Sequence, residues 1–490
     1  MTKGANLSAA IENNPGLPDH GADPNLLGWK LLAAKLITET QLKEALERQK
    51  AKGGRLGENL NELGFLTLDR FNRFLKKHPD APKTVEETGL GLSFLAELTL
   101  KHILFLVEFK FGDIAERMKL PVAVVDPVVE FLRQNKFVEI KGASQLMRSA
   151  YRLALTDQGR KRAAELLEIC GYVGPTPVPL EDYRKMTVGQ TVKNVNVTQE
   201  TLNQAFSNLV VNERTMKRLG PAIISGKSIF LYGPPGNGKS AFAEAIGKTL
   251  TETVYIPHAI LVGGEIIRVF DPVNHIPAEP EAGKGVVDQR WVFIKRPVVV
   301  TGGELTLKSL DLEFDSISKF YLAPLQMKAN NGLFIIDDFG RQPIEPKMLL
   351  NRWVVPLERR VDFMTLHTGM KFEIPFDELI IFCTNIEPKA LMDEAFLRRI
   401  RYKIHIGHPT EEEFQAIFIR VCEDKGIPFD KEVFDHLWEN CYRKFGVTPN
   451  ACHPRDLIEF TIDDSRYYRR NARLTKEGII EAWNNYFVEK

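Results

Sequence analysis

The feature that most constrains the fold is a glycine-rich loop between two apolar segments. The four residues Ile229 to Tyr232 precede the loop, and the amphipathic sequence AFAEAIGKTL follows it. The loop comprises Gly233, Pro234, Pro235, Gly236, Asn237, Gly238, Lys239 and Ser240. This spacing between a strand and a helix predicts backbone N–H groups that converge on phosphate oxygens at a helix N-terminus. Lys239 would reach the β- and γ-phosphates of ATP, and Ser240 would ligate Mg²⁺.

Two further apolar segments end in polar residues that suit the same site. Leu333 to Ile336 are followed by Asp337 and Asp338, and a segment that ends at Thr384 is followed by Asn385. Asp337 would hold the Mg²⁺ shell through water, and Asp338 would orient or deprotonate the attacking water. Asn385 would hydrogen-bond that water or the γ-phosphate. The alternative for the acidic pair is a solvated junction between a strand and a loop.

Composition is that of an ordinary globular protein. The 490 residues suggest about three domains, and 44% apolar with 26% charged residues is usual. Lys and Arg number 65 and Asp and Glu 64, so nucleic-acid or membrane binding would need a local basic patch. The apolar runs are too short to span a bilayer, and residues 1–16 lack the apolar stretch of a secretory signal. Five scattered cysteines indicate reduced thiols, so we expect a cytoplasmic protein without membrane insertion.

An internal repeat with a period of 29 residues predicts a small helical domain over residues 25–78. The recurring pairs are Leu27-Gly28 with Leu56-Gly57, Leu31 with Leu60, Leu42 with Phe71, and Leu46 with Leu75. Each unit has the pattern of a short apolar helix, a turn and an amphipathic helix. Thr38, with Gln41 three residues later, predicts a capping box. The polar residues 1–24 predict a flexible tail.

Residues 89–170 follow the order helix, helix, helix, hairpin, helix, which predicts a winged helix-turn-helix domain. Its third helix begins after Pro121 or, alternatively, at Pro127. Its last helix is capped by Thr156 or Asp157. Two polar, proline-containing segments, residues 79–88 and 171–182, are predicted as linkers on either side of this domain.

The phosphate-loop motifs resemble those of the AAA+ ATPase family over residues 183–490. Gly233 to Ser240 resemble its Walker A loop, Asp337 and Asp338 its Walker B end, and Asn385 its sensor 1. The resemblance implies an α/β P-loop NTPase core in which a parallel sheet carries the site, followed by a helical lid. We expect the core and the lid to divide near residue 410.

One position departs from the family pattern. The second Walker B acid is usually Glu, and this chain has Asp338. The shorter side chain draws the carboxylate back by about one bond length, and misplacements of that order can cost rate heavily. The departure predicts slow hydrolysis or a differently held water.

Three arginines resemble further elements of the family. The segment MDEAFLRRI is similar to the helix that carries the arginine finger, with Arg399 as the best match and Arg398 as the second. A finger stabilises charge on the nucleotide of a neighbouring subunit, which implies a homo-oligomeric ring, expected to be hexameric. Arg455 in HPRDL resembles sensor 2 and would approach the γ-phosphate. Surface ion pairs are the alternative for Arg398 and Arg399, and an ordinary helix-start arginine for Arg455.

The region around the acidic pair resembles the MoxR-like branch of the family. In the sequence DDFGRQPIEPKMLLNRWVVPLERRVDF, Arg341 and Arg352 would lie near a subunit interface or in structural ion pairs. Residues 255–325 exceed a minimal core and form a predicted β-rich insertion. VYIPHAILVGGEIIRVFD and RWVFIKRPVVVTGGEL alternate and contain Gly-Gly pairs, so each predicts a β-hairpin. This insertion is a candidate pore or substrate element, or a decorative extension.

The N-terminal repeat resembles the N-terminal domain of type II secretion and type IV pilus assembly ATPases, some of which bind cyclic di-GMP. The second unit matches through Arg55 and Gly57, but the first has Leu26 where Arg is expected and Lys35 where Gly is expected. Losing one Arg removes a charge-assisted contact. We therefore expect no cyclic di-GMP binding, and a docking or structural role instead.

The winged helix offers little to nucleic acid. Its third helix, residues 122–137, carries two acidic and two basic residues and so has no net charge. A modest basic patch includes Arg148, Arg152 and residues 160–162. We favour protein interaction over DNA binding here.

These features favour an ATP- and Mg²⁺-dependent AAA+ ring ATPase that remodels or assembles a protein partner. Two alternatives stay open: a DNA-binding regulator that uses the winged helix, and a slow nucleotide-gated scaffold, which Asp338 suggests. The partner is not identified by the sequence.

Overall fold

The computed structural model describes residues 28, 31–32, 36–53, 56–67, 71, 79–143, 151–195, 197–279, 287–391 and 394–487. The chain forms two compact units, residues 1–81 with 279–288, and residues 82–278 with 289–490. The predicted tail, residues 1–24, lies outside the described residues, as do Leu26, Lys35 and Arg55.

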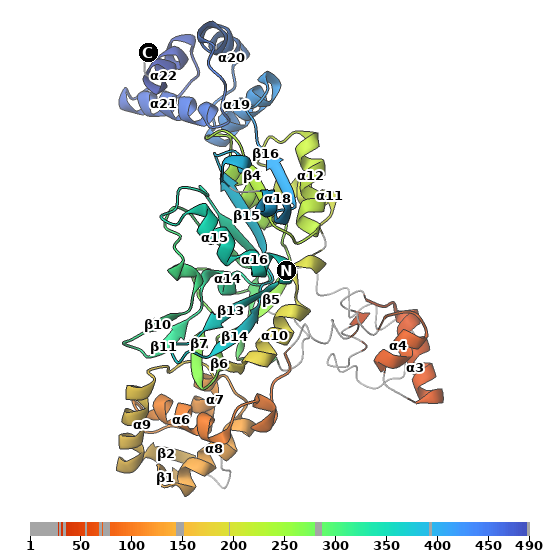
Figure 1. Ribbon diagram of the computed structural model, residues 1–490, viewed down its shortest axis with the longest axis vertical. Coiled ribbons are helices and arrows are strands. Elements are labelled where there is room, and N and C mark those ends of the chain that lie inside the picture. Colours follow the sequence, from red (N-terminus) through yellow and green to blue (C-terminus); the bar gives the residue numbers. More distant parts are fainter. Residues whose placement is uncertain are drawn as a thin grey trace. The chain divides into compact units, whose positions relative to one another are not determined.

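The first unit is helical, as predicted. Its described helices are α3 (Glu39–Lys52) and α4 (Leu56–Glu62) (Figure 1). The capping box is confirmed, because the Thr38 side chain accepts from the Gln41 N–H while the Gln41 side chain accepts from the Thr38 N–H. An ion pair between Arg48 and Glu62 joins the two helices.

Packing explains the Leu-Gly repeat. A Cβ on Gly28 would lie 2.8 Å from the Leu42 side chain, and a Cβ on Gly57 would lie 2.2 Å from the Phe71 ring. Each glycine therefore lies under the apolar residue that follows it 14 positions later in the same unit. Leu42 and Phe71 are both buried. The Leu-Gly repeat thus allows close packing of Leu42 on Gly28 and of Phe71 on Gly57.

The centre of the second unit is a five-stranded parallel sheet. Its strands are β4 (Ile229–Tyr232), β9 (Val298–Thr301), β12 (Leu333–Ile336), β15 (Leu379–Thr384) and β16 (Tyr402–His405), in the spatial order β16-β4-β15-β12-β9. All neighbouring pairs are parallel. Strands β12 and β15 are buried throughout, as strands covered on both faces should be.

Alternate side chains of the sheet enter two separate cores. Ile229 and Leu231 pack with α11 (Gln199–Ala205), α12 (Glu213–Ile224) and α13 (Lys239–Lys248). On the other face, the centroid of the Phe334 ring lies 5.6 Å from that of Trp353. Trp353 is the single residue between α15 (Pro346–Arg352) and α16 (Val354–Arg359). Short helices α14 (Leu325–Lys328), α17 (Pro388–Leu391) and α18 (Glu394–Arg399) complete this region. The predicted α/β P-loop core is confirmed.

The elements expected of a winged helix are present in the predicted order. They are α6 (Leu92–Ile103), α7 (Phe111–Met118), α8 (Val122–Gln134), β1 (Val138–Ala143), β2 (Tyr151–Leu155) and α9 (Asp157–Ile169). Helix α8 begins after Pro121 and contains Pro127, so the first of the two predicted starts is correct. Thr156 caps α9 by accepting from the Gly159 N–H. The short η1 (Glu86–Thr88) precedes α6.

The region beside the core differs from the sequence prediction. The first predicted hairpin is confirmed as β6 (Ala259–Val262) and β7 (Glu265–Arg268). The second is wrong, because β8 (Trp291–Lys295) pairs with β5 (Thr253–Pro257), and β9 joins the central sheet. Strand β9 is the edge strand of the central sheet and pairs only with β12, a parallel partner 35 positions later in the chain that the local alternation pattern cannot indicate.

The predicted linker 171–182 is a packed connection. It contains β3 (Val178–Pro179), which pairs with β6 in a second sheet of order β10-β11-β7-β6-β3, and it leads into α10 (Leu180–Gly189). The other strands of this region are β10 (Glu313–Asp315), β11 (Phe320–Leu322), β13 (Val361–Thr365) and β14 (Lys371–Pro375), with the short η4 (Lys308–Leu310). Ala259 of β6 and Ile266 of β7 share a hydrophobic core with helices α6, α7 and α8, so this sheet packs against those helices.

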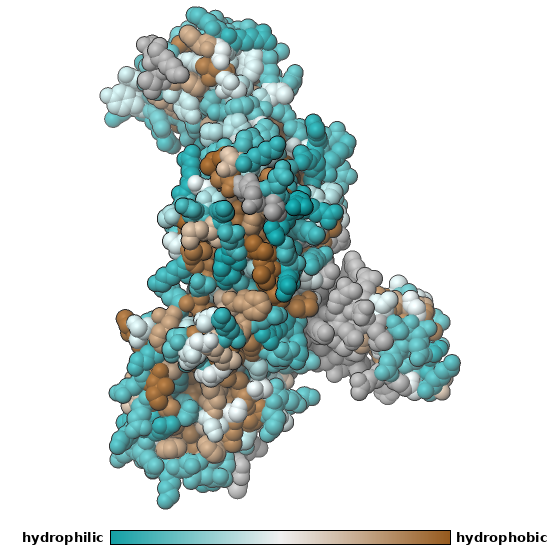
Figure 2. Space-filling model, viewed as in Figure 1, coloured by the Kyte–Doolittle hydropathy of each residue, from teal (hydrophilic) through white to brown (hydrophobic). Residues whose placement is uncertain are grey.

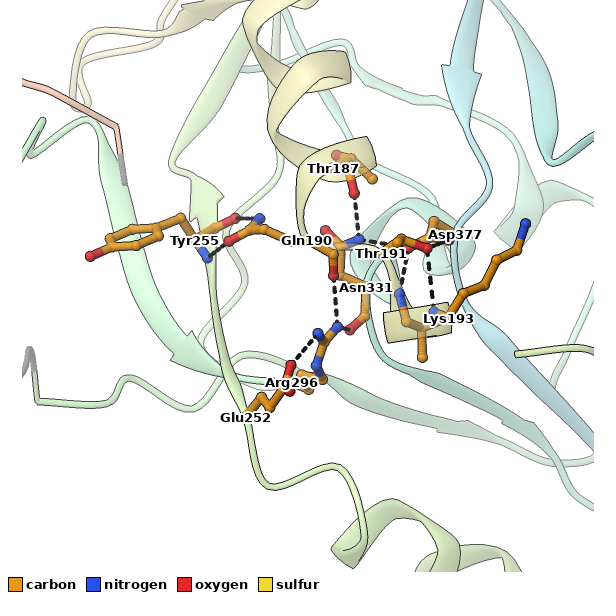
Figure 3. A network of polar contacts seen from close by, with 10 residues as sticks. Thr187, Gln190, Thr191, Lys193, Glu252, Tyr255, Arg296, Asn331 and Asp377 are labelled. Atoms are coloured by element: carbon orange, nitrogen blue, oxygen red, sulfur yellow. Dashed lines mark hydrogen bonds and ion pairs between the residues drawn. The ribbon is translucent and has the colours of Figure 1, made fainter. Parts of the chain in front are cut away.

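A buried polar network holds the amino ends of the central strands (Figure 3). The Arg296 guanidinium donates to the carbonyls of Gln190 and Asn331, at 2.9 and 2.6 Å, and to Glu252 at 2.8 Å. Asp377 accepts from Thr191 Oγ1, the Val192 N–H of η3 (Val192–Asn194) and Asn331 Nδ2, at 2.7, 2.9 and 2.8 Å. These contacts join α10 and β5 to the sheet.

We expect Asp377→Ala to destabilise the protein by about 3 kcal/mol or more, because the change leaves three donors without their acceptor at a buried site. Urea denaturation followed by tryptophan fluorescence measures the loss. The exposed Asp424→Ala is the control and should stay within about 0.5 kcal/mol of the parent. An equal, small effect of both changes would contradict the structural role of Asp377.

The C-terminal region is helical, as predicted for the lid. It contains α19 (Glu411–Lys425), α20 (Lys431–Leu437), the π-helical η5 (Trp438–Arg443), α21 (His453–Tyr467) and α22 (Lys476–Tyr486). These helices bury their own aromatic core, which includes Phe414, Phe434 and Trp483. Among the described residues, no helix combines the length and the apolar character needed to cross a membrane.

Candidate nucleotide-binding site

The glycine-rich loop leaves the carboxyl end of β4 and enters α13. Gly233, Gly236 and Gly238 have φ values of 146°, 74° and 79°, which other residues rarely adopt. A Cβ on Gly233 would lie 2.0 Å from the Ile406 carbonyl oxygen, so only glycine fits against this neighbouring backbone. The loop therefore keeps its N–H groups at the start of α13, where the helix dipole favours an anion.

Lys239 lies across the loop. Its ammonium donates to the carbonyls of Gly233 and Pro234, both at 2.9 Å. Burial lowers the pKa of Lys239, and the carboxylates of Asp337 and Asp338 act in the opposite direction. An ammonium has three donors, so one stays available for a phosphate oxygen beside the two carbonyl contacts.

Ser240 and Asp337 meet at the same edge of the sheet. The Ser240 hydroxyl donates to Asp337 Oδ2 at 2.6 Å, although the two residues are 97 positions apart. A hydroxyl and a carboxylate oxygen beside a phosphate loop are the hard oxygen donors that Mg²⁺ prefers. These residues fit the ion that the sequence implied.

Asp338 is exposed at the start of the turn that follows β12, with a φ of 48°. This turn depends on Gln342, which the sequence analysis missed. The Gln342 amide donates to the carbonyls of Asp337 and Asp338, at 2.9 and 3.2 Å, and its oxygen accepts from the Gly340 N–H at 2.8 Å. The only sequence signal was a glutamine soon after an acidic pair, which is too common to single out.

Asn385 directly follows β15, the strand between β4 and β12. The Thr384 hydroxyl donates to the Phe339 carbonyl at 2.6 Å, and the Phe339 N–H donates to the Cys383 carbonyl at 2.7 Å. These contacts tie the turn after β12 to the end of β15. The sheet therefore brings Asn385 to the edge that carries Lys239 and the acidic pair.

The start of α21 is bonded to the phosphate loop. The Ala451 N–H donates to Asn237 Oδ1, and the Cys452 N–H donates to the Gly236 carbonyl, both at 2.9 Å. Arg455 lies in the first turn of α21, where its side chain is 61% exposed and contacts Asp456 at 3.2 Å. The exposed guanidinium is not fixed by burial and can change partner.

A cavity of about 390 Å³ opens beside the phosphate loop, between α12, the end of β16 and α19. Its lining consists of Val210, Val211, Asn212, Arg214, Thr215, Arg218, Asn237, Phe242, His405, Ile406, Gly407, His408, Pro409, Thr410, Glu413, Ile417 and Ala451. Apolar side chains such as Phe242 and Ile417 lie here beside charged ones, and such a mixture can hold a planar base together with its polar groups. Sequence analysis missed this cavity because its lining comes from four separate segments.

Arg398 and Arg399 lie near the amino ends of the parallel strands, whereas the phosphate loop lies at their carboxyl ends. They end α18 just before β16, whose first residue, Tyr402, pairs with Ile229 at the start of β4. The four residues of β4 separate that edge from the phosphate loop by about 13 Å. Neither arginine is therefore beside the loop of its own chain, and Arg399 contacts Glu358 at 2.6 Å.

A second cavity, of about 620 Å³, surrounds these two arginines. Its lining is strongly basic and consists of Lys193, Lys227, Ser228, Leu357, Glu358, Arg360, Glu378, Ile380, Arg398 and Arg399. Such a surface suits an anionic group. The cavity is separate from the one beside the phosphate loop.

Glu378 is an unusual member of this lining. It is buried, and neither of its carboxyl oxygens has a hydrogen-bond partner among the described residues. Burial raises the pKa of Glu378 well above its ordinary value. The folded protein therefore keeps this proton to a higher pH than the unfolded chain, which loses it near pH 4.3.

Because the folded-state pKa is raised, this group lowers stability as the pH rises above the ordinary glutamate pKa of about 4.3 toward the raised value. We expect Glu378→Gln to raise the thermal unfolding midpoint at pH 8 more than at pH 5. The exposed Glu373→Gln serves as the control at both values. A Glu378→Gln effect of equal size at both pH values would show that its carboxyl is ionised in the folded protein.

The two other arginines that the sequence analysis singled out, Arg341 and Arg352, differ in their surroundings. Arg352 forms a bidentate pair with Asp362, at 2.5 and 3.0 Å, and the Asp362 side chain is 1% exposed. Arg352 is therefore a structural ion-pair partner, the second of its two predicted roles. Arg341 is exposed near the acidic pair.

The sheet, the phosphate loop and the helical lid give the second unit an AAA+-type P-loop fold. A family profile described as a domain of unknown function (DUF8689) matches residues 410–485. No curated protein matches the chain.

Several solved structures are similar at low identity. NtrX from Brucella abortus is 14% identical with a TM-score of 0.36, over 58% of this chain and 57% of that chain, less than two thirds of its length. The RuvB Holliday junction branch migration motor of Thermotoga maritima is 14% identical with a TM-score of 0.32, over 60% and 71%. Domain III of the Thermotoga maritima replication initiation protein DnaA is 15% identical with a TM-score of 0.34, over 59% and 98%. Identities and TM-scores this low leave the function to be argued from the chain's own residues.

Proposed function

We propose that this chain is an ATPase that works as a homo-oligomeric ring and remodels or assembles a protein partner. The observation that carries the proposal is the meeting of Lys239, Ser240 and Asp337 at one edge of the sheet. A base-sized cavity opens beside them. Phosphate, metal and base would thus be bound by adjoining surfaces of a single chain.

Each residue has a role that follows from its place. The loop N–H groups and Lys239 bind the phosphates, and Ser240 with Asp337 would hold Mg²⁺, which would supply positive charge beside the phosphate oxygens. Asp338 is the base or the orienting group for water, and Asn385 aligns that water from the neighbouring strand. Arg455 approaches the γ-phosphate from the lid.

The placement of Arg398 and Arg399 supports action between subunits. Both lie at the edge of the sheet away from their own phosphate loop, so either could complete a site only on a neighbouring chain. A closed ring, which we propose to be hexameric, gives every subunit such a neighbour.

The ion pairs of the winged helix support a protein partner over DNA. Arg133 on α8 is held by Glu130 at 2.8 Å, Arg152 by Glu108 at 3.4 Å, and Arg162 by Glu97 at 2.9 Å. Cations already paired in this way contribute less to phosphate binding. Of the rest of the predicted patch, Arg160 and Lys161 are exposed, and Arg148 lies outside the described residues.

The test is Asp338→Asn, which keeps the shape of the side chain and removes its charge. We expect the variant to bind ATP normally and to lose at least 100-fold in phosphate release, because water is no longer activated. It should also retain the protein partner in a pull-down with ATP. The exposed Asp424→Asn is the control. Hydrolysis by Asp338→Asn at the parent rate would assign the base elsewhere.

A further inference from the structure

The most basic stretch of the lid lies where α21 ends. The eleven residues from Arg466 to Lys476 contain four arginines and one lysine, and no acidic residue. Because the whole chain has a net charge of only +1, this is a strong local concentration. The lid forms the uppermost part of Figures 1 and 2, and its visible surface is mainly hydrophilic.

The arginines of this segment point to solvent. Leu474 is buried and Ala472 packs against the lid core, so these two residues anchor the connection between α21 and α22. Arg469, Arg470 and Arg473 are all exposed. None of the three has an acidic partner among the described residues. Arg466 has only a 3.8 Å contact with Asp463, and both of those side chains are exposed.

Two aromatic rings accompany the charges. Tyr467 is 80% exposed and Tyr468 is 55% exposed, with their ring centroids 4.9 Å apart. The Arg470 guanidinium lies over the Tyr468 ring at 5.0 Å. Exposed rings cost free energy in water unless something covers them, and an arginine plane over tyrosine is a surface on which a base can stack.

The backbone at this point favours glycine, yet it carries arginine. The Arg470 N–H donates to the Ser465 carbonyl at 2.8 Å, and the Arg469 N–H donates to the Arg466 carbonyl at 3.1 Å. This is the Schellman ending of a helix, and Arg469 occupies its left-handed position with a φ of 54°. A non-glycine residue there costs about 1 kcal/mol. The cationic side chain is thus kept at some expense of stability.

A helix C-terminus attracts positive charge, so one basic residue here needs no further explanation. The helix dipole does not account for four arginines, two exposed rings and a strained arginine together. We propose that the segment from Arg466 to Lys476 binds single-stranded nucleic acid. The arginines contact phosphates, and Tyr467 and Tyr468 stack on unpaired bases.

The test measures fluorescence anisotropy of labelled 20-nucleotide dT and rU strands with the full chain, without nucleotide, so that it does not depend on ATP hydrolysis. If four phosphates are contacted, raising the salt from 50 to 200 mM should weaken binding about 50-fold. Comparing dT with rU shows whether DNA or RNA is preferred, and binding of either supports the proposal. Binding to neither strand at 50 mM salt would overturn it.

Three variants separate stacking from charge. The double change Tyr467→Ala, Tyr468→Ala should weaken binding at least tenfold and leave the salt dependence unchanged. Arg469→Gly should reduce the slope of log K against log salt concentration by about 0.7. The variant should still fold, because glycine readily adopts the left-handed conformation of this position. The exposed Lys431→Ala, elsewhere on the lid, is the control.

Two further outcomes would overturn the proposal. The first is strand binding that the tyrosine and arginine changes leave untouched. The second is loss, in the same variants, of binding to polyglutamate or to vesicles rich in phosphatidylserine, with oligonucleotide binding unchanged. That result would assign the segment to an acidic protein or a membrane surface.

Discussion

Replacement of Lys239 by alanine is expected to weaken ATP binding by at least about 100-fold. Lys239 is the only side chain of the loop that carries positive charge, and its ammonium is held over the loop carbonyls at 2.9 Å. Charge-assisted hydrogen bonds of a partly buried ammonium contribute about 3 kcal/mol, which corresponds to that factor. Isothermal titration calorimetry with a non-hydrolysable ATP analogue measures the change.

Lys248→Ala is the matched control, because Lys248 is exposed in the last turn of the same helix. It should bind the analogue like the parent. The Lys239→Ala protein should keep the parent's thermal unfolding midpoint without nucleotide, which separates lost binding from lost folding. Near-parent affinity in a folded Lys239→Ala protein would mean that the phosphates bind elsewhere, and the proposed ATPase site would fail.

Replacement of Arg399 by alanine should leave ATP binding within about twofold of the parent and lower turnover by at least 100-fold. The side chain lies at the far edge of the sheet from its own loop, so its loss does not affect the chain's own phosphate contacts. It would remove transition-state stabilisation from the neighbouring site. Arg401→Ala, an exposed arginine beside it, is the control.

Mixing the two inactive variants tests action between subunits. A ring that contains both Arg399→Ala and Lys239→Ala chains has some interfaces that pair an intact loop with an intact arginine, so part of the activity should return. Full turnover by a monomeric parent protein, or no recovery although labelled subunits exchange, would contradict this assignment of Arg399. Repeating the mixture with Arg398→Ala decides between the two arginines.

The prediction of the candidate nucleotide-binding site rested on local sequence patterns. The loop, the acidic pair and Asn385 each follow a short apolar run, and parallel strands bring such ends to one edge. The base cavity was not predictable in this way, since Val211, His405 and Thr410 are ordinary residues until the chain folds. Strand β9 was missed for a related reason. Alternation along residues 291–301 resembled a hairpin, and only the partner strands decide between the two pairings.

The connection before the core shows a second limit. Proline and glycine in residues 171–182 predicted a linker, yet Val178 lies buried in a strand beside β6. Turn-forming residues indicate the local backbone conformation, but they do not indicate which other segments pack against it. Gln342 illustrates the same limit for side chains, because its three acceptor carbonyls come from two separate segments.

Helix α21 is attached to the phosphate loop at its amino end, so a rotation at the loop would move the whole helix. The two residues just before the helix, Ala451 and Cys452, are bonded to Asn237 and Gly236, and its 15 residues span about 22 Å to the arginine- and tyrosine-rich end. A rotation of about 10° at the pivot carries that far end through about 4 Å, roughly the spacing of successive strands in a sheet. A small rotation of α21 at the phosphate loop would thus become a larger displacement of the arginines and tyrosines at the other end of the helix.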